Sequence, residues 1–182
     1  MKLAKLHRST DPDFGWKHDN YIGSLPQKNT THTQWSDFFI EERIQPQLRR
    51  AINGGKVDKH IHSGFEKLFQ QVEKLFPKEP PSFIHGDLWG GNLLTDTNGA
   101  PVLIDPAVYY GHREMELAFM TLFDSQPPQF YEAYESIYPL DSGWMDRIEI
   151  CNLYPLLVHV NLFGGGYIES VLHILRRFTS RI

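Results

Sequence analysis

The sequence lacks the features that would place it in a secreted or membrane-bound class of protein. Its 182 residues contain a single cysteine, Cys151, so no internal disulfide can form and nothing indicates an oxidising compartment. No apolar run approaches the ~20 residues that a membrane-spanning helix needs. The first residues, MKLAKLHRST, lack the long apolar core of a signal peptide. We therefore expect a cytoplasmic protein with no membrane partner.

The charge balance argues against nucleic acid as the main partner. The formal net charge is −4 at pH 7, whereas a protein that binds nucleic acid usually carries a basic patch or stripe. No internal repeat, low-complexity tract or heptad run is found. The length and the 41% hydrophobic content predict one globular domain over residues 1–182, large enough for a proper core.

What the sequence does contain is a dense set of polar residues in one stretch, 83–110. A His-Gly-Asp bend ends at Asp87, and Asn92 follows five residues later. The segment 92–104 predicts a β-hairpin, because an Asn-Gly pair lies between two apolar runs. The hairpin would return Asp105 to the neighbourhood of Asn92. Two carboxylates and a carboxamide are therefore expected to converge.

This arrangement suits phosphoryl transfer. A hydroxyl nucleophile needs a carboxylate to accept its proton, and nucleotide phosphates need oxygen ligands that hold Mg²⁺. The spacing His-x-Asp-x-x-x-x-Asn, with a further Asp after a hairpin, is typical of the catalytic loop and metal-binding Asp of protein kinases. It predicts Asp87 as the general base and Asn92 and Asp105 as Mg²⁺ ligands. His85 would brace the backbone of the loop.

Two other interpretations of these residues stay open. Asp87 and Asp105 could cap turns and Asn92 could begin a strand, because Asp and Asn are common in turns. A metal hydrolase that uses His85, Asp87 and Asp105 is weaker, because such sites usually carry more His ligands at consistent spacing. The combined spacing around one hairpin favours the kinase-type site.

The residues of this stretch also resemble those of a known family, the fructosamine (ketosamine) kinases, which are relatives of the aminoglycoside and choline phosphotransferases. The segments that carry the resemblance are HGDLWGGN at 85–92, IDPAVYYGHRE at 104–114, LAKLHRST at 3–10, FGWKHDNYIGSLPQKN at 14–29 and WSDFF at 35–39. The resemblance implies an α+β, mostly helical fold. This would be a protein-kinase-like C-terminal lobe with a small catalytic β-hairpin.

The resemblance also implies an activity. The expected enzyme is an ATP- and Mg²⁺-dependent phosphotransferase that moves the γ-phosphate of ATP to a sugar hydroxyl of a ketosamine. The acceptor would be a glycated small-molecule amine or a glycated protein lysine. Trp89, two residues after the base, would stack on the sugar. An aminoglycoside-type kinase is a weaker alternative, since that family usually has His or Pro after HGD and Trp after the metal Asp.

The N-terminal lobe of such kinases is not evident in the sequence. It would supply a G-x-G-x-x-G turn and a strand-borne Lys paired with a Glu, and neither is found; Gly164–Gly166 is interpreted as a helix junction. We therefore keep two alternatives to an active single chain. One is a non-catalytic remnant or interaction module, and the other is a dimer that supplies the missing lobe in trans.

Hydrophobic periodicity predicts the remaining elements. Residues 9–33 are expected to be a loop that either lies near the cleft or is anchored to the core by Trp16 and Tyr21. Helices are expected at 1–8, 35–52 with a kink or division at Pro46, 58–76, 113–124, 129–137, 142–160 with a bend at Pro155, and 166–178.

Some polar side chains of these helices also carry expectations. Glu116 is interpreted as an acid that interacts favourably with the helix dipole near the N-terminus of its helix. The resembling family often has Asp at this position, so a role of Glu116 in tethering the backbone stays open. Arg113 is interpreted as a loop tether rather than a phosphate clamp. His7, His60 and His62 are interpreted as solvated rather than metal-binding. His60 and His62, two apart on a helix, would face different sides.

Overall fold

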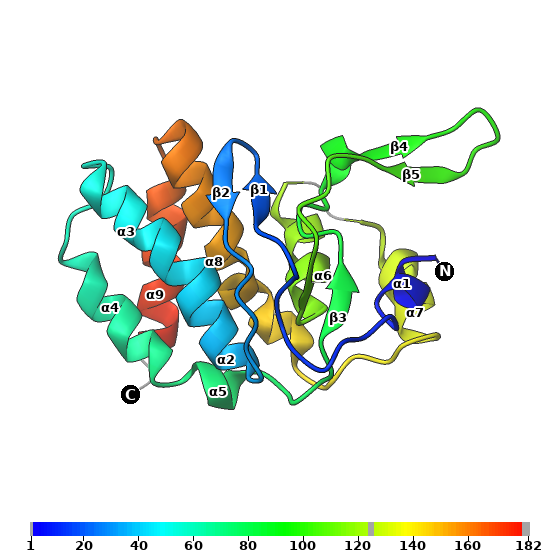
Figure 1. Cartoon of the computed structure of the whole chain (residues 1–182), viewed down its shortest axis with the longest axis horizontal. Helices are drawn as coiled ribbons and strands as arrows, with labels where there is room; N and C mark the ends of the chain where they lie inside the picture. The colour runs from blue at the N-terminus through cyan, green and yellow to red at the C-terminus, as the bar shows by residue number, and fades with distance from the viewer. Residues whose placement is uncertain (1, 124–125, 180–182) are drawn as a thin grey trace.

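The structure of the chain is a computed structural model that describes residues 2–123 and 126–179. It confirms the predicted α+β, mostly helical fold (Figure 1). The helices are α1 (Lys2–Leu6), α2 (Trp35–Phe38), the π-helical η1 (Phe39–Ile44), α3 (Gln45–Asn53), α4 (Ile61–Phe69), α5 (Val72–Leu75), the 3₁₀-helical η2 (Gly90–Asn92), α6 (Glu114–Leu122), α7 (Pro128–Glu135), α8 (Trp144–Phe163) and α9 (Tyr167–Thr179). Met1 and Asp124, the outer ends of two predicted helices, lie outside the described residues.

The strands of the described residues form three separate antiparallel pairs. They are β1 (Asn20–Ile22) with β2 (Leu25–Gln27), β3 (Ser82–Ile84) with β6 (Tyr109–Gly111), and β4 (Leu93–Thr95) with β5 (Pro101–Leu103). The β4–β5 pair confirms the predicted hairpin, and it projects from the body of the molecule in Figure 1. The β3–β6 pair brings the two ends of the polar stretch together.

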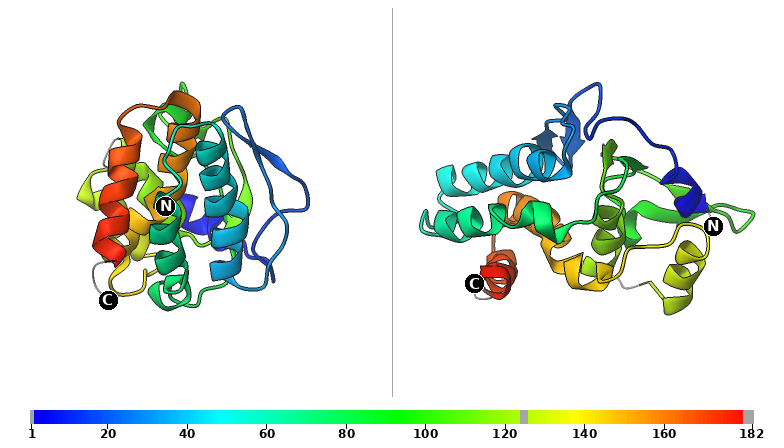
Figure 2. Two further views of the ribbon diagram at one scale, coloured as in Figure 1. Left: turned by 90° about the vertical axis from the view of Figure 1, so that its left-hand side faces the viewer. Right: turned by 90° about the horizontal axis from the view of Figure 1, so that it is seen from below.

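The long helix α8 organises the helical half of the molecule. It packs against α6, α9 and α3 (Figures 1 and 2), and Ile150, Leu153 and Leu157 are fully buried in it. Pro155 lies inside one continuous helix. α8 also runs beyond the predicted end at residue 160, to Phe163. Although α8 has 20 residues, no helix in the described ranges is long and apolar enough to cross a membrane.

The predicted division of helix 35–52 at Pro46 takes the form of a change in hydrogen-bond pattern. α2 leads into the six-residue π-helical η1, and α3 follows with Pro46 in its first turn. Proline lacks an N–H group, and its ring clashes with the carbonyl four residues earlier. The wider π-helical turns accommodate that defect without ending the helix.

Two predictions about regular structure are wrong. The predicted helix 58–76 is two helices, α4 and α5, because α4 packs on α9 whereas α5 contacts α2. Phe65 and Leu68 of α4 are fully buried. The predicted loop 9–33 contains the β1–β2 hairpin. Trp16 packs against Phe83 and Tyr110, as predicted for an anchor, but Tyr21 is exposed.

Truncating the core face of α8 should destabilise the protein. Leu157 is fully buried, so Leu157→Ala is expected to lower the free energy of unfolding by about 2–5 kcal/mol. Met145→Ala is the matched control, because Met145 lies on the same helix and is 66% exposed; its effect should stay within about 0.5 kcal/mol. Urea denaturation measures both values, and equal effects would contradict this assignment of the core face.

Candidate functional site

The loop after β3 takes a backbone conformation that requires glycine at residue 86. Gly86 has φ +81°, and a Cβ atom there would lie 2.2 Å from the carbonyl oxygen of Ala107. The amide of Ala107 also donates a hydrogen bond of 2.8 Å to the carbonyl oxygen of His85. The loop that carries Asp87 is therefore packed directly on the segment that follows Asp105.

Asn92 is held beside Asp87. Its Nδ2 atom donates to the carbonyl oxygen of Asp87 at 2.8 Å and to the carboxylate atom Oδ2 of Asp87 at 3.1 Å. The short helix η2 positions it, since the amide of Asn92 donates to the carbonyl of Trp89 at 3.0 Å. Because Nδ2 makes both of these hydrogen bonds, Oδ1 is the atom of the Asn92 side chain that could accept a hydrogen bond or bind a cation.

Asp105 follows the strand that pairs back on Asn92. Leu93 lies opposite Leu103, and the amide of Ile104 donates to the carbonyl of Asn92 at 3.1 Å. Asp105 has φ +51°, a left-handed conformation that is uncommon for residues other than glycine. Such conformations often occur at functional sites. The hairpin thus returns the second carboxylate to the region of the first.

The surroundings of Asp87 alter its acidity. Burial raises the pKa of the Asp87 carboxyl to about 6, against the lowering effect of the hydrogen bond from Asn92. The nearby charges of Asp105 and Glu116 raise this pKa further, because two close carboxylates disfavour joint ionisation. A carboxylate with this pKa can take up a proton close to neutral pH, as a general base must.

His85 links the two halves of the site through both of its ring nitrogens. Nε2 lies 2.9 Å from the carbonyl oxygen of Ile104, and Nδ1 lies 3.3 Å from the amide nitrogen of Asp87. These partners assign the proton to Nε2, because a carbonyl can only accept and an amide can only donate. The ring thereby connects the end of the hairpin to the loop.

Glu116 lies in the first turn of α6, as the helix-dipole interpretation expects, and it also binds the backbone of the loop that carries Asp87. The side chain is buried, and its Oε1 and Oε2 accept the amide hydrogens of Gly86 (2.9 Å) and His85 (3.1 Å). Oε2 also lies 2.8 Å from Nε2 of His7, whose Nδ1 lies 2.7 Å from the hydroxyl of Tyr134. His7 is therefore a buried link from α1 to α6 and not solvated, whereas His60 and His62 are exposed as predicted.

These contacts lower the pKa of Glu116 and so favour its ionised form. Burial alone would raise its pKa, but the interactions with His7 and the amides of Gly86 and His85 together lower it below the ordinary value. Glu116 is therefore a charged, fully hydrogen-bonded group beneath the loop. The sequence signal for it was weak, because an acidic residue in the first turn of a helix is common.

A second support comes from the β1–β2 hairpin. Nε2 of Gln27 donates to the carbonyl of Ala107 at 3.0 Å, and Nδ2 of Asn20 donates to the carbonyl of Val108 at 2.8 Å. The hydroxyl of Tyr154 donates to Oε1 of Gln27 at 2.6 Å. Residues 9–33 therefore do lie beside the site. Sequence reasoning noted the polar and aromatic residues of this segment but missed Gln27 and Tyr154.

Arg43 and Arg113 are buried guanidinium groups with different roles. Arg43 donates to the carboxamide oxygen of Asn29 at 2.7 Å and stacks on Tyr109 at 3.9 Å, which fixes the base of the β1–β2 hairpin. Arg113 forms a two-point ion pair with Glu79, at 2.8 and 2.6 Å. This confirms the prediction that Arg113 is a tether.

Trp89 lies at the open side of the loop. Its ring covers Gly91 so closely that a Cβ atom there would come within 2.3 Å of a ring carbon. The ring meets Phe123 edge to face at 5.9 Å between centroids, and 38% of the residue is exposed. An exposed aromatic surface is therefore fixed two residues from Asp87.

The oxygen atoms of this site fit Mg²⁺ held jointly with phosphates. No group of three His, Cys, Asp or Glu side chains within residues 2–123 and 126–179 could hold a metal by itself. Mg²⁺, however, is usually bound by one or two carboxylates together with substrate phosphates and water. Oδ1 of Asn92 and the carboxylate of Asp105 would provide such a partial set of hard ligands.

Comparison with known proteins places this geometry in context. The model of the fructosamine kinase family matches residues 1–181. A protein of Enterococcus faecium named "Probable ketoamine kinase" is 41% identical over 178 residues, which are 97% of this chain and 64% of the relative. A protein with the same name from Lactiplantibacillus plantarum is 40% identical over 180 residues, again 97% of this chain and 64% of the relative.

A solved structure shows the same likeness in three dimensions. The crystal structure of a candidate fructosamine-3-kinase from Thermobifida fusca is 40% identical, with a TM-score of 0.91 over 100% of this chain and 63% of that one. The chain thus spans somewhat less than two thirds of the length of each of these relatives.

Neutralising Glu116 should loosen the site and change the pH dependence of stability. Because the pKa of Glu116 is lowered on folding, its contribution is fully present above the unfolded pKa and is lost as pH falls through the folded pKa. Glu116→Gln should therefore cost about 3 kcal/mol of unfolding free energy at pH 7. The difference in unfolding free energy between the wild type and Glu116→Gln should narrow as pH falls below 4.5, the ordinary pKa of this carboxyl.

Urea denaturation of both proteins between pH 3 and pH 8 measures this difference in unfolding free energy. Glu135→Gln is the control, because Glu135 is an exposed carboxylate on α7 and should behave as the wild type. A difference that stayed constant over the whole pH range would contradict an ionised Glu116.

Proposed function

The chain belongs to the fructosamine kinase family, and we propose that it carries the acceptor-side catalytic site of an ATP-dependent ketoamine kinase. The observation that carries the proposal is the meeting of Asp87 and Asn92 at one loop, with Asp105 returned beside them by the β4–β5 hairpin. The names of the relatives support a ketoamine acceptor. Either a glycated small amine or a glycated lysine has the required sugar hydroxyl.

Asp87 is the proposed general base. Its carboxylate accepts the proton of the sugar hydroxyl while the hydroxyl oxygen forms a bond to the γ-phosphorus of ATP and the bond to the β-phosphate oxygen breaks. A pKa of about 6 keeps most Asp87 carboxylates ionised at neutral pH and still basic enough to hold the proton. The hydrogen bond from Asn92 orients the carboxylate.

The other residues position the reactants. Asn92 and Asp105 would hold Mg²⁺, which when bound neutralises charge on the phosphates. His85 keeps the loop and the end of the hairpin in register through its contacts with Asp87 and Ile104. Trp89 offers an exposed ring on which a sugar can stack beside the base.

Nucleotide binding is the first test, because the relatives are longer than this chain. A thermal shift with Mg²⁺ and ATP should show stabilisation of about 2.7 kcal/mol at ligand 100-fold above Kd. Transfer of the γ-phosphate from ATP to the fructosyl adduct of lysine is then followed by mass spectrometry, which detects the phosphorylated adduct. No stabilisation and no transfer would favour a non-catalytic interaction module.

Removing the proposed base should nearly abolish transfer. Asp87→Asn is nearly isosteric and cannot accept the proton, so kcat should fall by about 10²–10⁴-fold while the protein stays folded. Asp146→Asn is the control, because that side chain is 83% exposed on α8, and its kcat should be unchanged. A kcat for Asp87→Asn within a few-fold of the wild type would remove Asp87 from this role.

The pH dependence should report the same group. Because the ionised form of Asp87 is the active one, kcat/KM for the ketoamine at saturating Mg²⁺ and ATP should rise with pH and level off above about 6. Initial rates between pH 5 and pH 8 give the profile. A profile that is flat through this range would contradict a base with a raised pKa.

A further inference from the structure

A row of aromatic rings leads from the catalytic loop to the end of α8. It consists of Trp89, Phe123, His159, Phe163 and Tyr167, and is called the aromatic strip below. The ring centroids lie 5.9 Å apart for Trp89 and Phe123, 4.8 Å for Phe123 and His159, 5.4 Å for His159 and Phe163, and 5.1 Å for His159 and Tyr167. The strip is thus continuous, although its residues come from the loop, the C-cap of α6, α8 and α9.

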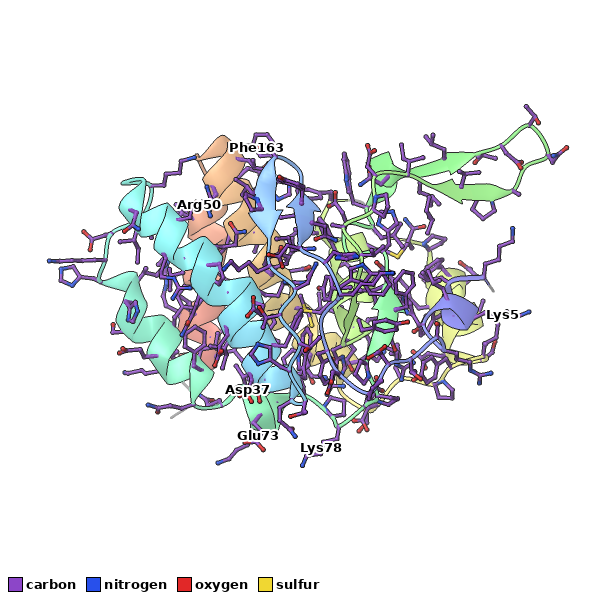
Figure 3. All side chains as sticks on the ribbon, in the orientation of Figure 1. Lys5, Asp37, Arg50, Glu73, Lys78 and Phe163 are labelled. Carbon is purple, nitrogen blue, oxygen red and sulfur yellow. The ribbon has the colours of Figure 1, made fainter. Side chains whose placement is uncertain are left out.

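Much of the aromatic strip is open to solvent, although Tyr167 packs against the hydrophobic core. Trp89 and Phe123 are each 38% exposed, and Phe163 is 68% exposed. Figure 3 shows Phe163 at the C-terminal end of α8, beside the tip of the β1–β2 hairpin that docks on the site. An exposed apolar surface that continues directly from a catalytic loop is typical of a ligand-binding groove.

His159 gives this surface a polar centre of defined character. Its Nδ1 lies 2.7 Å from the carbonyl oxygen of Pro155, so Nδ1 carries the proton and donates. In the neutral ring, Nε2 is then a hydrogen-bond acceptor, and the same ring contacts Phe123 and Phe163. Ring faces attract cations, and an acceptor nitrogen among them favours a cation that carries N–H groups.

We propose that the aromatic strip binds the amine side of the ketoamine acceptor, an inference that rests on the function proposed above. With the sugar beside Asp87 and Trp89, the alkylammonium nitrogen lies one carbon from the sugar carbonyl and meets Phe123 and His159. The carbon chain on that nitrogen then extends toward Phe163. The strip would therefore select acceptors by the length and apolar character of their amine.

The length dependence can be tested by binding alone. Isothermal titration without ATP compares the fructosyl adduct of methylamine with the Nε-fructosyl adduct of a lysine that carries a benzyloxycarbonyl group. The long adduct should bind the wild type about tenfold more tightly, a difference of about 1.4 kcal/mol. Phe163→Ala should remove most of this advantage and leave binding of the short adduct within about twofold.

Met145→Ala is the matched control for that measurement. Met145 is 66% exposed at the other end of α8, and its truncation should preserve the advantage of the long adduct. Equal binding of the two adducts by the wild type would overturn the inference. An advantage that survives in Phe163→Ala, or no detectable binding of either adduct, would overturn it as well.

The role of His159 can be tested separately with His159→Phe, which keeps an aromatic ring and removes the acceptor nitrogen. The wild type should prefer the long amine adduct to its ether analogue, in which oxygen replaces the amine nitrogen. His159→Phe should lose this preference and retain the effect of length. A preference that is unchanged in His159→Phe would contradict recognition of the ammonium group by Nε2.

The failure of this inference differs from a failure of the proposed function. Strip-dependent binding without phosphate transfer to either adduct would contradict the kinase activity and support the binding surface. Phosphate transfer, with adduct affinities that are unchanged by substitution of Phe163 or His159, would support the kinase activity and overturn the proposed role of the aromatic strip. Circular dichroism of each variant confirms that the exposed substitutions leave the fold intact.

Discussion

A buried carboxylate must be hydrogen-bonded, because leaving its charge unpaired in the interior costs several kcal/mol, and in this chain the requirement falls on Glu116. Its partners are the amides of His85 and Gly86 and the ring of His7. The same contacts that satisfy the charge therefore join α1 and α6 to the loop that carries Asp87. The position of the base thus depends on a carboxylate 29 residues further along the chain.

The loop is also constrained from the side that follows Asp105. Gly86 permits an approach to Ala107 that a side chain would block, and Gln27 holds the carbonyl of Ala107 from the β1–β2 hairpin. The left-handed backbone of Asp105 is kept in place between this segment and the β4–β5 hairpin. A short local motif thus gains its rigidity from distant parts of the fold, and the proposed chemistry relies on that rigidity, since phosphoryl transfer depends on positioning.

The parts of this arrangement that were predictable are local in sequence. The hairpin and the approach of Asn92 to Asp87 follow from an Asn-Gly turn and a five-residue spacing. The fold class follows from the resemblance to the fructosamine kinases, and helical periodicity places most of the helices. The contact between Glu116 and His7 could not be predicted, because it spans 109 residues, and the acidic first turn of α6 has a common local explanation. The β1–β2 pair was missed because its strands have three residues each, too few for a reliable alternation. The break between α4 and α5 reflects packing on different partners, which periodicity does not report.

The central claim is that Asp87, Asn92 and Asp105 surround one divalent-ion site. NMR spectroscopy tests this claim. Paramagnetic Mn²⁺, added in place of Mg²⁺ together with a non-hydrolysable ATP analogue, selectively broadens the signals of backbone amides that lie close to the bound ion. The account predicts strong broadening for residues 85–92 and 104–107, no effect on α4 and α9, and loss of the broadening in Asp105→Asn. Broadening that centres on the exposed His60 and His62, or that persists unchanged in Asp105→Asn, would contradict it.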